Sequence, residues 1–338
     1  MLRLFQSIFG GAPAIDRQYP ERLVDAATER ALDGTDPRLR ILPGYREKLR
    51  PIVIHAIDHV VRLVEDLPSP VELSRKGYSA DTRLAAFFAS PDHLVEVVNT
   101  DRNVSAYLAS TEAAAAERII ALLVTVKRER NVLGIELEGE ILKRDVPQIS
   151  VSFANHRVVD LATTEEETRR LLKRRAFDHL LGIALGRIAH VRKKRAGLEQ
   201  QRTLLRRKLM VLRSGRWGFD ETRGRAVSDV AAVETQLGEI EEQLQELGAD
   251  AGVLQLHLDI LSEVLSRAEQ QLWARPVPLI LDRMNIKRDH ARGNAHEIAL
   301  QELHSASGRT AILLPVVVPR SELRPRGDLI TEAQHYLA

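Results

Sequence analysis

The chain of 338 residues is long enough for about two domains, and its composition favours helices with exposed surfaces. Only 4% of the residues are aromatic and 28% are charged, a balance that argues against a large aromatic-filled core. The 49 basic and 47 acidic residues nearly cancel, which excludes a strong overall attraction to nucleic acid or to an anionic membrane. The chain has no cysteine, which excludes disulfide bonds, thiolate metal sites and a cysteine nucleophile.

Residues 1–15 form a short amphipathic segment. Leu2, Phe5, Ile8 and Phe9 share one helical face before two glycines end the pattern. A helix this short is unstable alone in water. We therefore expect these four side chains to dock on the protein's own core, on a partner or on a membrane surface.

Residues 16–112 are predicted to form a helical subdomain. An apolar helical face runs from Leu23 to Ala31, and Gly34 is predicted to stop this helix. A longer helix is predicted from Tyr45 to Leu67. Shorter helices follow, one of them starting at Ser90, where a serine precedes a proline and an aspartate.

Near Glu117 the spacing of apolar residues changes from a helical period to a period of two, which is typical of strands, and two blocks of strands are predicted. The first block is predicted as three antiparallel strands at 119–127, 135–141 and 148–153, with a turn at 131–134. The second block is predicted as strands at 278–286, 296–303 and 310–318, with a hairpin turn at Ser307 and Gly308. Because two or three isolated strands are only marginally stable, we expect both blocks, within 113–162 and 276–319, to join in one sheet. The remaining residues, 320–338, are predicted to form a loose tail.

Residues 163–275, between the two blocks, are predicted to form an antiparallel two-helix coiled coil. Thr163 and Thr164 followed by three glutamates are a strong helix start. The first arm then carries a four-three repeat of mostly apolar residues: Phe177, Leu181, Ala184, Ile188, Val191, Leu198, Leu205, Leu209 and Leu212, with Arg195 and Arg202 in the same register. The second arm repeats the pattern from Val230 to Leu272 and is predicted to end at Pro276.

The two arms are expected to pair with each other, because the connection between them is short and folding back buries both apolar seams. The first arm is basic and the second is rich in glutamate, which agrees with this pairing. The expected register places Arg202 opposite Leu237 to Ile240. The fold class predicted for the whole chain is therefore α+β, with a helical N-terminal subdomain, a mixed or antiparallel sheet built from two separated strand blocks, and an inserted helical hairpin.

The hairpin tip, residues 213–226, is the most distinctive local feature. It combines arginines with two large aromatic side chains: Arg213, Arg216, Trp217, Phe219, Arg223 and Arg225. This composition is typical of protein-binding hot spots and of surfaces that stack on nucleobases. The alternative is that Trp217 and Phe219 close the end of the seam while the arginines are solvated.

No phosphate-binding loop, dinucleotide fingerprint, zinc-protease helix or nucleophile elbow is present in the sequence. His55 and His59 have the four-residue spacing that can bind a metal ion from one helix face. They lack a visible third ligand, so they are interpreted as structural histidines, and neither a metal nor another cofactor is predicted.

These observations favour a non-enzymatic structural or adaptor protein of the cytoplasm that uses its coiled-coil arm to bind a protein partner or further copies of itself. One alternative is nucleic-acid binding along the basic first arm and the tip. Another is an enzyme with an unrecognised site between the helical subdomain and the sheet. The N-terminal segment would add at most a weak peripheral contact with a membrane.

Overall fold

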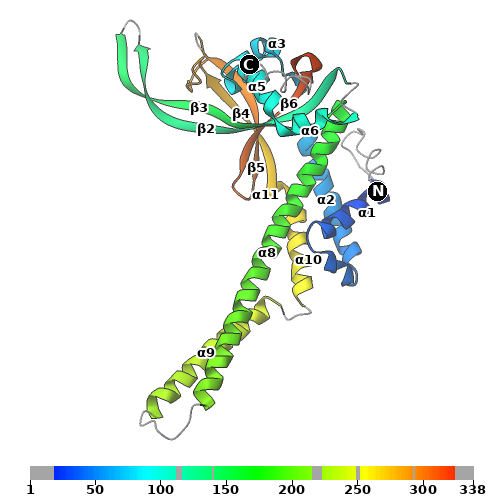
Figure 1. The fold of residues 1–338 in the computed structure, drawn as a ribbon, viewed down its shortest axis with the longest axis vertical. Helices are drawn as coiled ribbons and strands as arrows, with labels where there is room; N and C mark the ends of the chain where they lie inside the picture. The colour runs from blue at the N-terminus through cyan, green and yellow to red at the C-terminus, as the bar shows by residue number, and fades with distance from the viewer. Residues whose placement is uncertain are drawn as a thin grey trace, which may run out of the picture. The chain divides into compact units, whose positions relative to one another are not determined.

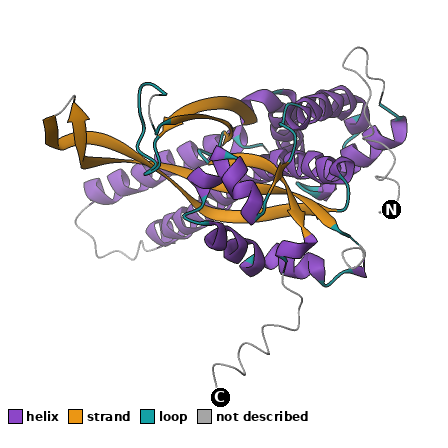
Figure 2. Cartoon of the chain, turned by 90° about the horizontal axis from the view of Figure 1, so that it is seen from above, coloured by secondary structure: helices purple, strands orange, loops and turns teal. Residues whose placement is uncertain are grey.

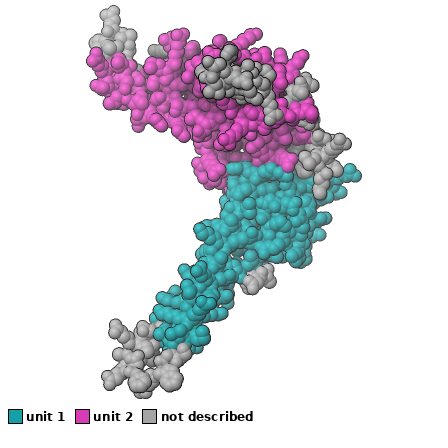
Figure 3. All heavy atoms as spheres, in the orientation of Figure 1, with its two compact units in different colours: residues 1–58, 177–268 teal, residues 59–176, 269–338 magenta. Residues whose placement is uncertain are grey.

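The computed structural model describes residues 19–111, 116–138, 141–214, 223–248, 252–291 and 294–323. It combines helices with a largely antiparallel sheet, and the long helix α8 (Glu165–Ser214) lies in the chain between the two strand blocks, so the predicted fold class is confirmed (Figure 1). The chain divides into two compact units, residues 1–58 with 177–268 and residues 59–176 with 269–338 (Figure 3). The segment 16–112, predicted as a helical subdomain, contributes residues to both units.

Unit 1 is a helical assembly around α8 from residue 177 onward. It contains α1 (Glu21–Asp33), the short 3-10 helix η2 (Pro37–Ile41), the start of α2 (Tyr45–Glu65), α9 (Arg223–Glu246) and α10 (Gly252–Ser266). Its core includes these almost completely buried side chains: Leu23, Leu32, Leu39, Leu49, Val53, Leu180, Ala184, Ile188, Leu261 and Leu265. Burial of these apolar groups, together with the ion pair between Arg30 and Asp178, holds α1 against α8 and α10 against η2.

Local signals fix several helix ends as predicted. The helix α1 stops at Gly34, and Thr164 Oγ1 accepts a hydrogen bond of 3.3 Å from Glu167 N at the start of α8. Ser90 caps α5 (Pro91–Thr100) by accepting a hydrogen bond from His93 N. Since each cap satisfies a backbone group that the helix leaves unpaired, the boundaries follow from the sequence.

The second arm of the hairpin is two helices, and the prediction of a single continuous helix was wrong. The helix α9 ends at Glu246, and Gly248 has a left-handed φ of 85° before α10 begins at Gly252. A glycine adopts this conformation without steric cost, which allows the break. Arg195 on α8 donates a hydrogen bond to the Gly248 carbonyl at the break.

Unit 2 is built on one six-stranded sheet, in which the two strand blocks join as predicted. The main order is β3 (Ile141–Ala162), β2 (Arg118–Glu138), β6 (Thr310–Pro319), β5 (His296–Ser305) and β4 (Leu272–Leu281). The blocks meet where β2 pairs antiparallel with β6, for example Leu123 with Leu314. A two-residue strand, β1 (Val71–Glu72), pairs parallel with β6 and was not predicted.

The strand β4 begins directly after α11 (Ala268–Gln271), so the predicted helix end at Pro276 and strand start at Pro278 were wrong. Both prolines lie inside β4, which forms an edge of the sheet. The carbonyl group of Ile280, two residues after Pro278, points away from β5 and accepts a hydrogen bond from Arg288 N. Residues 276 and 278 share this orientation, so neither proline removes a hydrogen bond from the ladder with β5.

The strands β2 and β3 are a long paired ribbon, and the prediction of three shorter strands was wrong (Figures 1 and 2). Asn131 and Gly134, which suggested a turn, are paired within the ribbon with Ile149 and Val146. Three bulges each give β3 one more residue than β2. The bulges contain the left-handed residues of β3, which are Asp145, Asn155 and Asp160. Asn and Asp tolerate this conformation better than other non-glycine residues, so they mark the bulges.

Helices cover one face of the sheet: α3 (Arg75–Ala80), α4 (Thr82–Phe87), α5 and α6 (Arg102–Leu108). Their apolar side chains, including Leu84, Phe88 and Leu94, share one core with sheet residues such as Leu123 and Val316. On the other face, Leu122 packs with residues from the end of α2 and the start of α8: Val64, Leu67 and Leu172. The short 3-10 helix η3 (Arg320–Glu322) follows β6, and Arg75 pairs with Glu322 there. The predicted tail from residue 324 onward lies outside the described residues.

Candidate functional site

The helices α8 and α9 lie antiparallel, and their cross-helix ion pairs define the register. Arg213 Nη2 lies 2.5 Å from Glu234 Oε1, and Arg206 Nη2 lies 2.6 Å from Glu241 Oε1. A step of seven residues toward the N-terminus on α8 therefore matches a step of seven toward the C-terminus on α9. This register places Arg202 near Gln245. The prediction that Arg202 lies opposite Leu237 to Ile240 was therefore wrong.

We call α8 from Glu199 to Arg213 and α9 from Val230 to Glu246 the distal hairpin. Its seam buries Val233, Leu237 and Leu244 on α9, and Leu198 on α8 lies at its inner end. Leu205, Leu209 and Leu212 of the predicted seam are half-buried. Burial of these apolar side chains stabilises the pairing of the two helices, because exposed ion pairs contribute little.

A second set of apolar side chains on the distal hairpin remains in solvent. Leu204 is 56% exposed, Met210 63% and Val211 66%. Leu204, Lys208 and Val211 are spaced i, i+4 and i+7, so they form one stripe along α8, which we call the outer stripe. The stripe is visible in the sequence as two apolar residues seven apart beside the seam, but the four-three repeat alone does not reveal it.

A groove of about 440 Å³ lies between the two helices beside the outer stripe. Its lining, which we call the hairpin groove, is Gln201, Leu204, Leu205, Gln236, Glu239, Ile240 and Gln243. The groove is therefore lined by both apolar side chains and polar ones, the latter being amides from both helices and one carboxylate from α9. This combination is typical of surfaces that bind other proteins.

The two helices of the distal hairpin carry opposite charge. Along α8 from 199 to 213 there are five basic residues, Arg202, Arg206, Arg207, Lys208 and Arg213, and one acidic residue, Glu199. Along α9 from 230 to 246 there are five acidic residues, Glu234, Glu239, Glu241, Glu242 and Glu246, and no basic residue. The surface is therefore divided into a basic and an acidic side, and a partner of matching pattern would bind in one orientation.

Among the predicted tip residues, Arg213 is engaged with Glu234 within the hairpin. Arg216, Trp217 and Phe219 lie outside the described residues, as do Leu2, Phe5, Ile8 and Phe9 of the N-terminal segment. Arg223 and Arg225 form the first turn of α9, and only their backbone is described. The structure thus brings the candidate site onto the distal hairpin next to the predicted tip.

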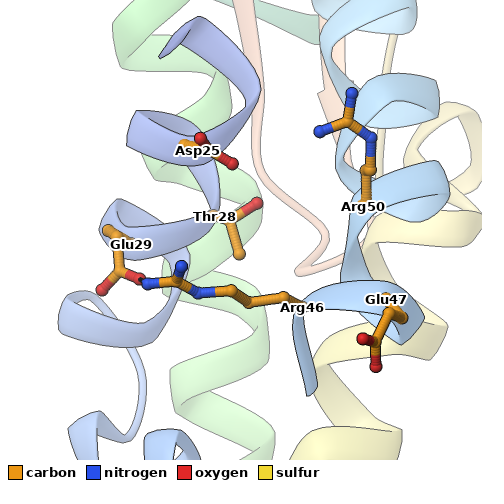
Figure 4. Close-up of a pocket in the computed structure, with 6 residues that line it drawn as sticks. All are labelled: Asp25, Thr28, Glu29, Arg46, Glu47 and Arg50. Atoms are coloured by element: carbon orange, nitrogen blue, oxygen red, sulfur yellow. Dashed lines mark hydrogen bonds and ion pairs between the residues drawn. The ribbon is translucent and has the colours of Figure 1, made fainter. Parts of the chain in front are cut away.

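A second, smaller pocket of about 220 Å³ lies between α1 and α2 (Figure 4). Asp25, Thr28 and Glu29 line it from α1, and Arg46 and Arg50 from α2. Arg46 reaches across the pocket, with 3.0 Å between its Nη2 and Glu29 Oε1 (Figure 4). Because the ion pair between Arg46 and Glu29 bridges the two helices across this pocket, we interpret it as a helix-packing contact.

Unit 1 also contains a buried polar cluster. Asp36 is only 2% exposed, and its carboxylate accepts hydrogen bonds from Arg38, Arg192 and His257. Burial alone would raise the pKa of Asp36, but these hydrogen bonds outweigh it and hold the pKa well below its usual range. Burial lowers the pKa of His257, although the bond to Asp36 opposes this. His257 is fully buried, so the cluster ties α8, α10 and the segment before η2 together and offers no access to a substrate.

The histidines considered for metal binding belong to a structural helix. His59 Nε2 lies 2.7 Å from the Leu272 carbonyl, at the start of β4. Within the described part of the chain, no group of three or more histidines, aspartates and glutamates is placed to hold a metal ion. In the same residues no helix is both long enough and apolar enough to cross a membrane.

The chain matches no protein family, no curated protein and no solved structure.

Proposed function

We propose that this protein is a non-enzymatic adaptor that binds another protein molecule through the distal hairpin. The observation that carries this proposal is the exposure of Leu204 and Val211, each more than half in solvent, on one helical face beside the hairpin groove. Single exposed apolar residues are common, but two on one helical face beside a groove with apolar lining favour an interaction site. Burial of one such side chain stabilises a complex by about 1.5–3 kcal/mol.

The charge pattern supports a protein partner over a nucleic acid. A nucleic acid needs basic residues that follow its phosphates, and two arginines of α8 in the distal hairpin are paired with glutamates of α9. The acidic side of the hairpin would repel a phosphate backbone. A protein partner can match both the basic and the acidic side, and can also cover the apolar stripe.

The test is the co-purification of protein partners with the full chain from its native cells. The double variant Leu204→Glu/Val211→Glu removes the apolar stripe, and a glutamate at position 204 stands four residues before Lys208, a spacing that favours the helix. Met284→Glu is the matched control, because Met284 is 81% exposed and lies far from the hairpin in the sequence.

We expect the wild type and Met284→Glu to retain the same partner, and the double variant to lose it while circular dichroism shows unchanged helix content. Identical partners for all three proteins would contradict the proposal. Salt-dependent binding of DNA or RNA that Lys208→Glu abolishes would favour a nucleic-acid partner instead.

In this proposal the adaptor acts in the cytoplasm, and residues 1–15 add a weak contact with a membrane surface. The support is the shared face of Leu2, Phe5, Ile8 and Phe9 in the sequence. Flotation of the full chain with anionic liposomes, compared with a chain lacking residues 1–12, tests this contact. Equal flotation of both chains would contradict it.

A further inference from the structure

The outer stripe lies on a second face of α8, separate from the seam with α9. Leu204 precedes the seam residue Leu205 by one position, which is about 100° around a helix. A helix at the corner of a four-helix bundle contacts two neighbours at roughly this angle, whereas a two-stranded coiled coil needs only one seam. The apolar pattern of α8 therefore fits a bundle with more helices than one distal hairpin supplies.

The groove positions on α9 occur at the same levels as the outer stripe. In the register set by the pairs of Arg206 and Arg213, Val211 is level with Gln236, Lys208 with Glu239 and Leu204 with Gln243. The three α9 residues line the hairpin groove and face the same side as Leu204. The methylene groups of glutamine and glutamate can cover an apolar side chain while their polar ends stay hydrated.

We propose that the hairpin groove binds the hairpin groove of a second copy of this chain, so that two distal hairpins form a four-helix bundle. This inference rests on the proposed function and names the partner. The occupant is argued from charge: a second copy offers an acidic α9 to the basic α8, and a basic α8 to the acidic α9.

The charge pattern also selects the symmetry. A two-fold axis parallel to the helices places each α8 between two α9 helices, so that basic and acidic helices alternate around the bundle. A two-fold axis perpendicular to the helices would stack α8 on α8 and α9 on α9, which brings like charges together. A rotation about the parallel axis does not shift a residue along the bundle, so Lys208 of one copy meets Glu239 of the second copy.

The charges needed for this contact are not used in the ion pairs between α8 and α9 of one chain. Among the described residues of the distal hairpin, those pairs involve Arg206 and Arg213, which leaves Lys208 and Glu239 for the second copy.

The first experiment measures the mass of the purified full chain by light scattering over a range of concentrations. One copy has a mass of 37.9 kDa, and we expect twice this mass at high concentration. Leu204→Glu/Val211→Glu should weaken the dimer about tenfold or more, because it places charges in an apolar contact, while Met284→Glu should leave it unchanged.

The second experiment exchanges the proposed charge pair between copies. Lys208→Glu alone and Glu239→Lys alone should each weaken self-association, because each homodimer then contains two like-charge contacts. A mixture of the two variants should form the heterodimer, in which both contacts are again between opposite charges. A change that only perturbs the fold of one chain would not be rescued by mixing.

Three results would overturn the inference: a monomer at all concentrations, a dimer that is insensitive to the groove variants, or no recovery of the dimer in the mixture. A monomer that still loses a different co-purifying protein in the Leu204→Glu/Val211→Glu variant would overturn the second copy as partner and leave the proposed function standing. A monomer that binds no protein through the groove would overturn both.

Discussion

Asp36 and His257 are separated by 221 positions in the chain and meet in the interior of unit 1, where Asp36 Oδ2 lies 2.8 Å from His257 Nδ1. Asp36 also receives hydrogen bonds from Arg38 and Arg192, so one carboxylate joins three segments of the chain. A buried carboxylate with this many donors is costly to remove, because its partners are left without an acceptor.

We therefore expect Asp36→Ala to destabilise the protein by about 3–5 kcal/mol. Urea unfolding followed by circular dichroism measures this change. Asp33→Ala is the matched control, because Asp33 lies on the same segment, is largely exposed and pairs with Arg40, and it should cost at most about 1 kcal/mol. Equal losses for the two variants would show that the buried cluster does not stabilise unit 1.

The same cluster predicts how stability depends on pH. Burial, helped by the nearby Arg192 and Arg38, lowers the pKa of His257 below its ordinary 6.5. The unfolded chain then binds the proton more tightly, so the stability from this group is complete above pH 6.5 and is lost as the pH falls through the lowered pKa. Burial and the neighbouring His93 lower the pKa of His156 as well, so His156 contributes with the same sign.

His257→Asn keeps a hydrogen-bond donor near Asp36 and removes the titrating group. We expect the free energy of unfolding of this variant to fall less steeply than that of the wild type as the pH is lowered below 6.5. Urea unfolding at a series of pH values compares the two slopes. An unchanged slope would mean that His257 has the same pKa in the folded and unfolded states.

The bulge at Asn155 in the β2–β3 ribbon should tolerate glycine but not valine. Asn155 is exposed and has a φ of 58°, a conformation that valine resists and glycine adopts freely. Asn155→Val should destabilise the protein by about 1–3 kcal/mol, whereas Asn155→Gly should be neutral or slightly stabilising. Thermal unfolding of the two variants tests this, and a neutral valine substitution would contradict the bulge geometry.

The seam of the distal hairpin should depend on apolar burial more than on its ion pairs. Leu237→Ala removes a buried side chain and should cost about 2–3 kcal/mol. Glu241→Gln removes only the exposed contact with Arg206 and should cost at most about 1 kcal/mol. Hydrogen exchange of the backbone amides of α9 measures the local effect, and a larger loss for Glu241→Gln would reverse this order.

Much of the fold could be predicted because its signals are local. Gly34, Ser90 and Thr164 end or start helices by satisfying backbone groups nearby, and Gly308 forms a hairpin turn at a φ of 78°. The joining of the two strand blocks followed from the marginal stability of each block alone.

The missed features depend on partners that are distant in the chain. Asn131 and Gly134 resemble a turn, but pairing with β3 keeps them extended. Pro276 and Pro278 resemble a helix end, but an edge strand accepts prolines whose nitrogens face outward. The strand β1 has only two residues and therefore carries no periodicity that a sequence could reveal.

The candidate site shows the same contrast. The four-three repeat predicted that the two arms would pair, and the cross-helix ion pairs agree with that antiparallel arrangement. The repeat does not distinguish a helix with one apolar seam from a helix with two. That distinction required the exposure of Leu204 and Val211, which only the packing of α8 against α9 determines.

The most direct test of the central claim, that a protein molecule covers the hairpin groove in the cell, is the labelling of a single cysteine by a membrane-permeant maleimide. Because the chain contains no cysteine, Leu204→Cys and the control Met284→Cys each introduce one unique thiol. We predict that the thiol at position 204 reacts much more slowly than the thiol at position 284 in living cells, and that the two react at similar rates in the purified, highly diluted chain. Equally fast labelling of both thiols in living cells would show that the groove is uncovered, and would contradict the account.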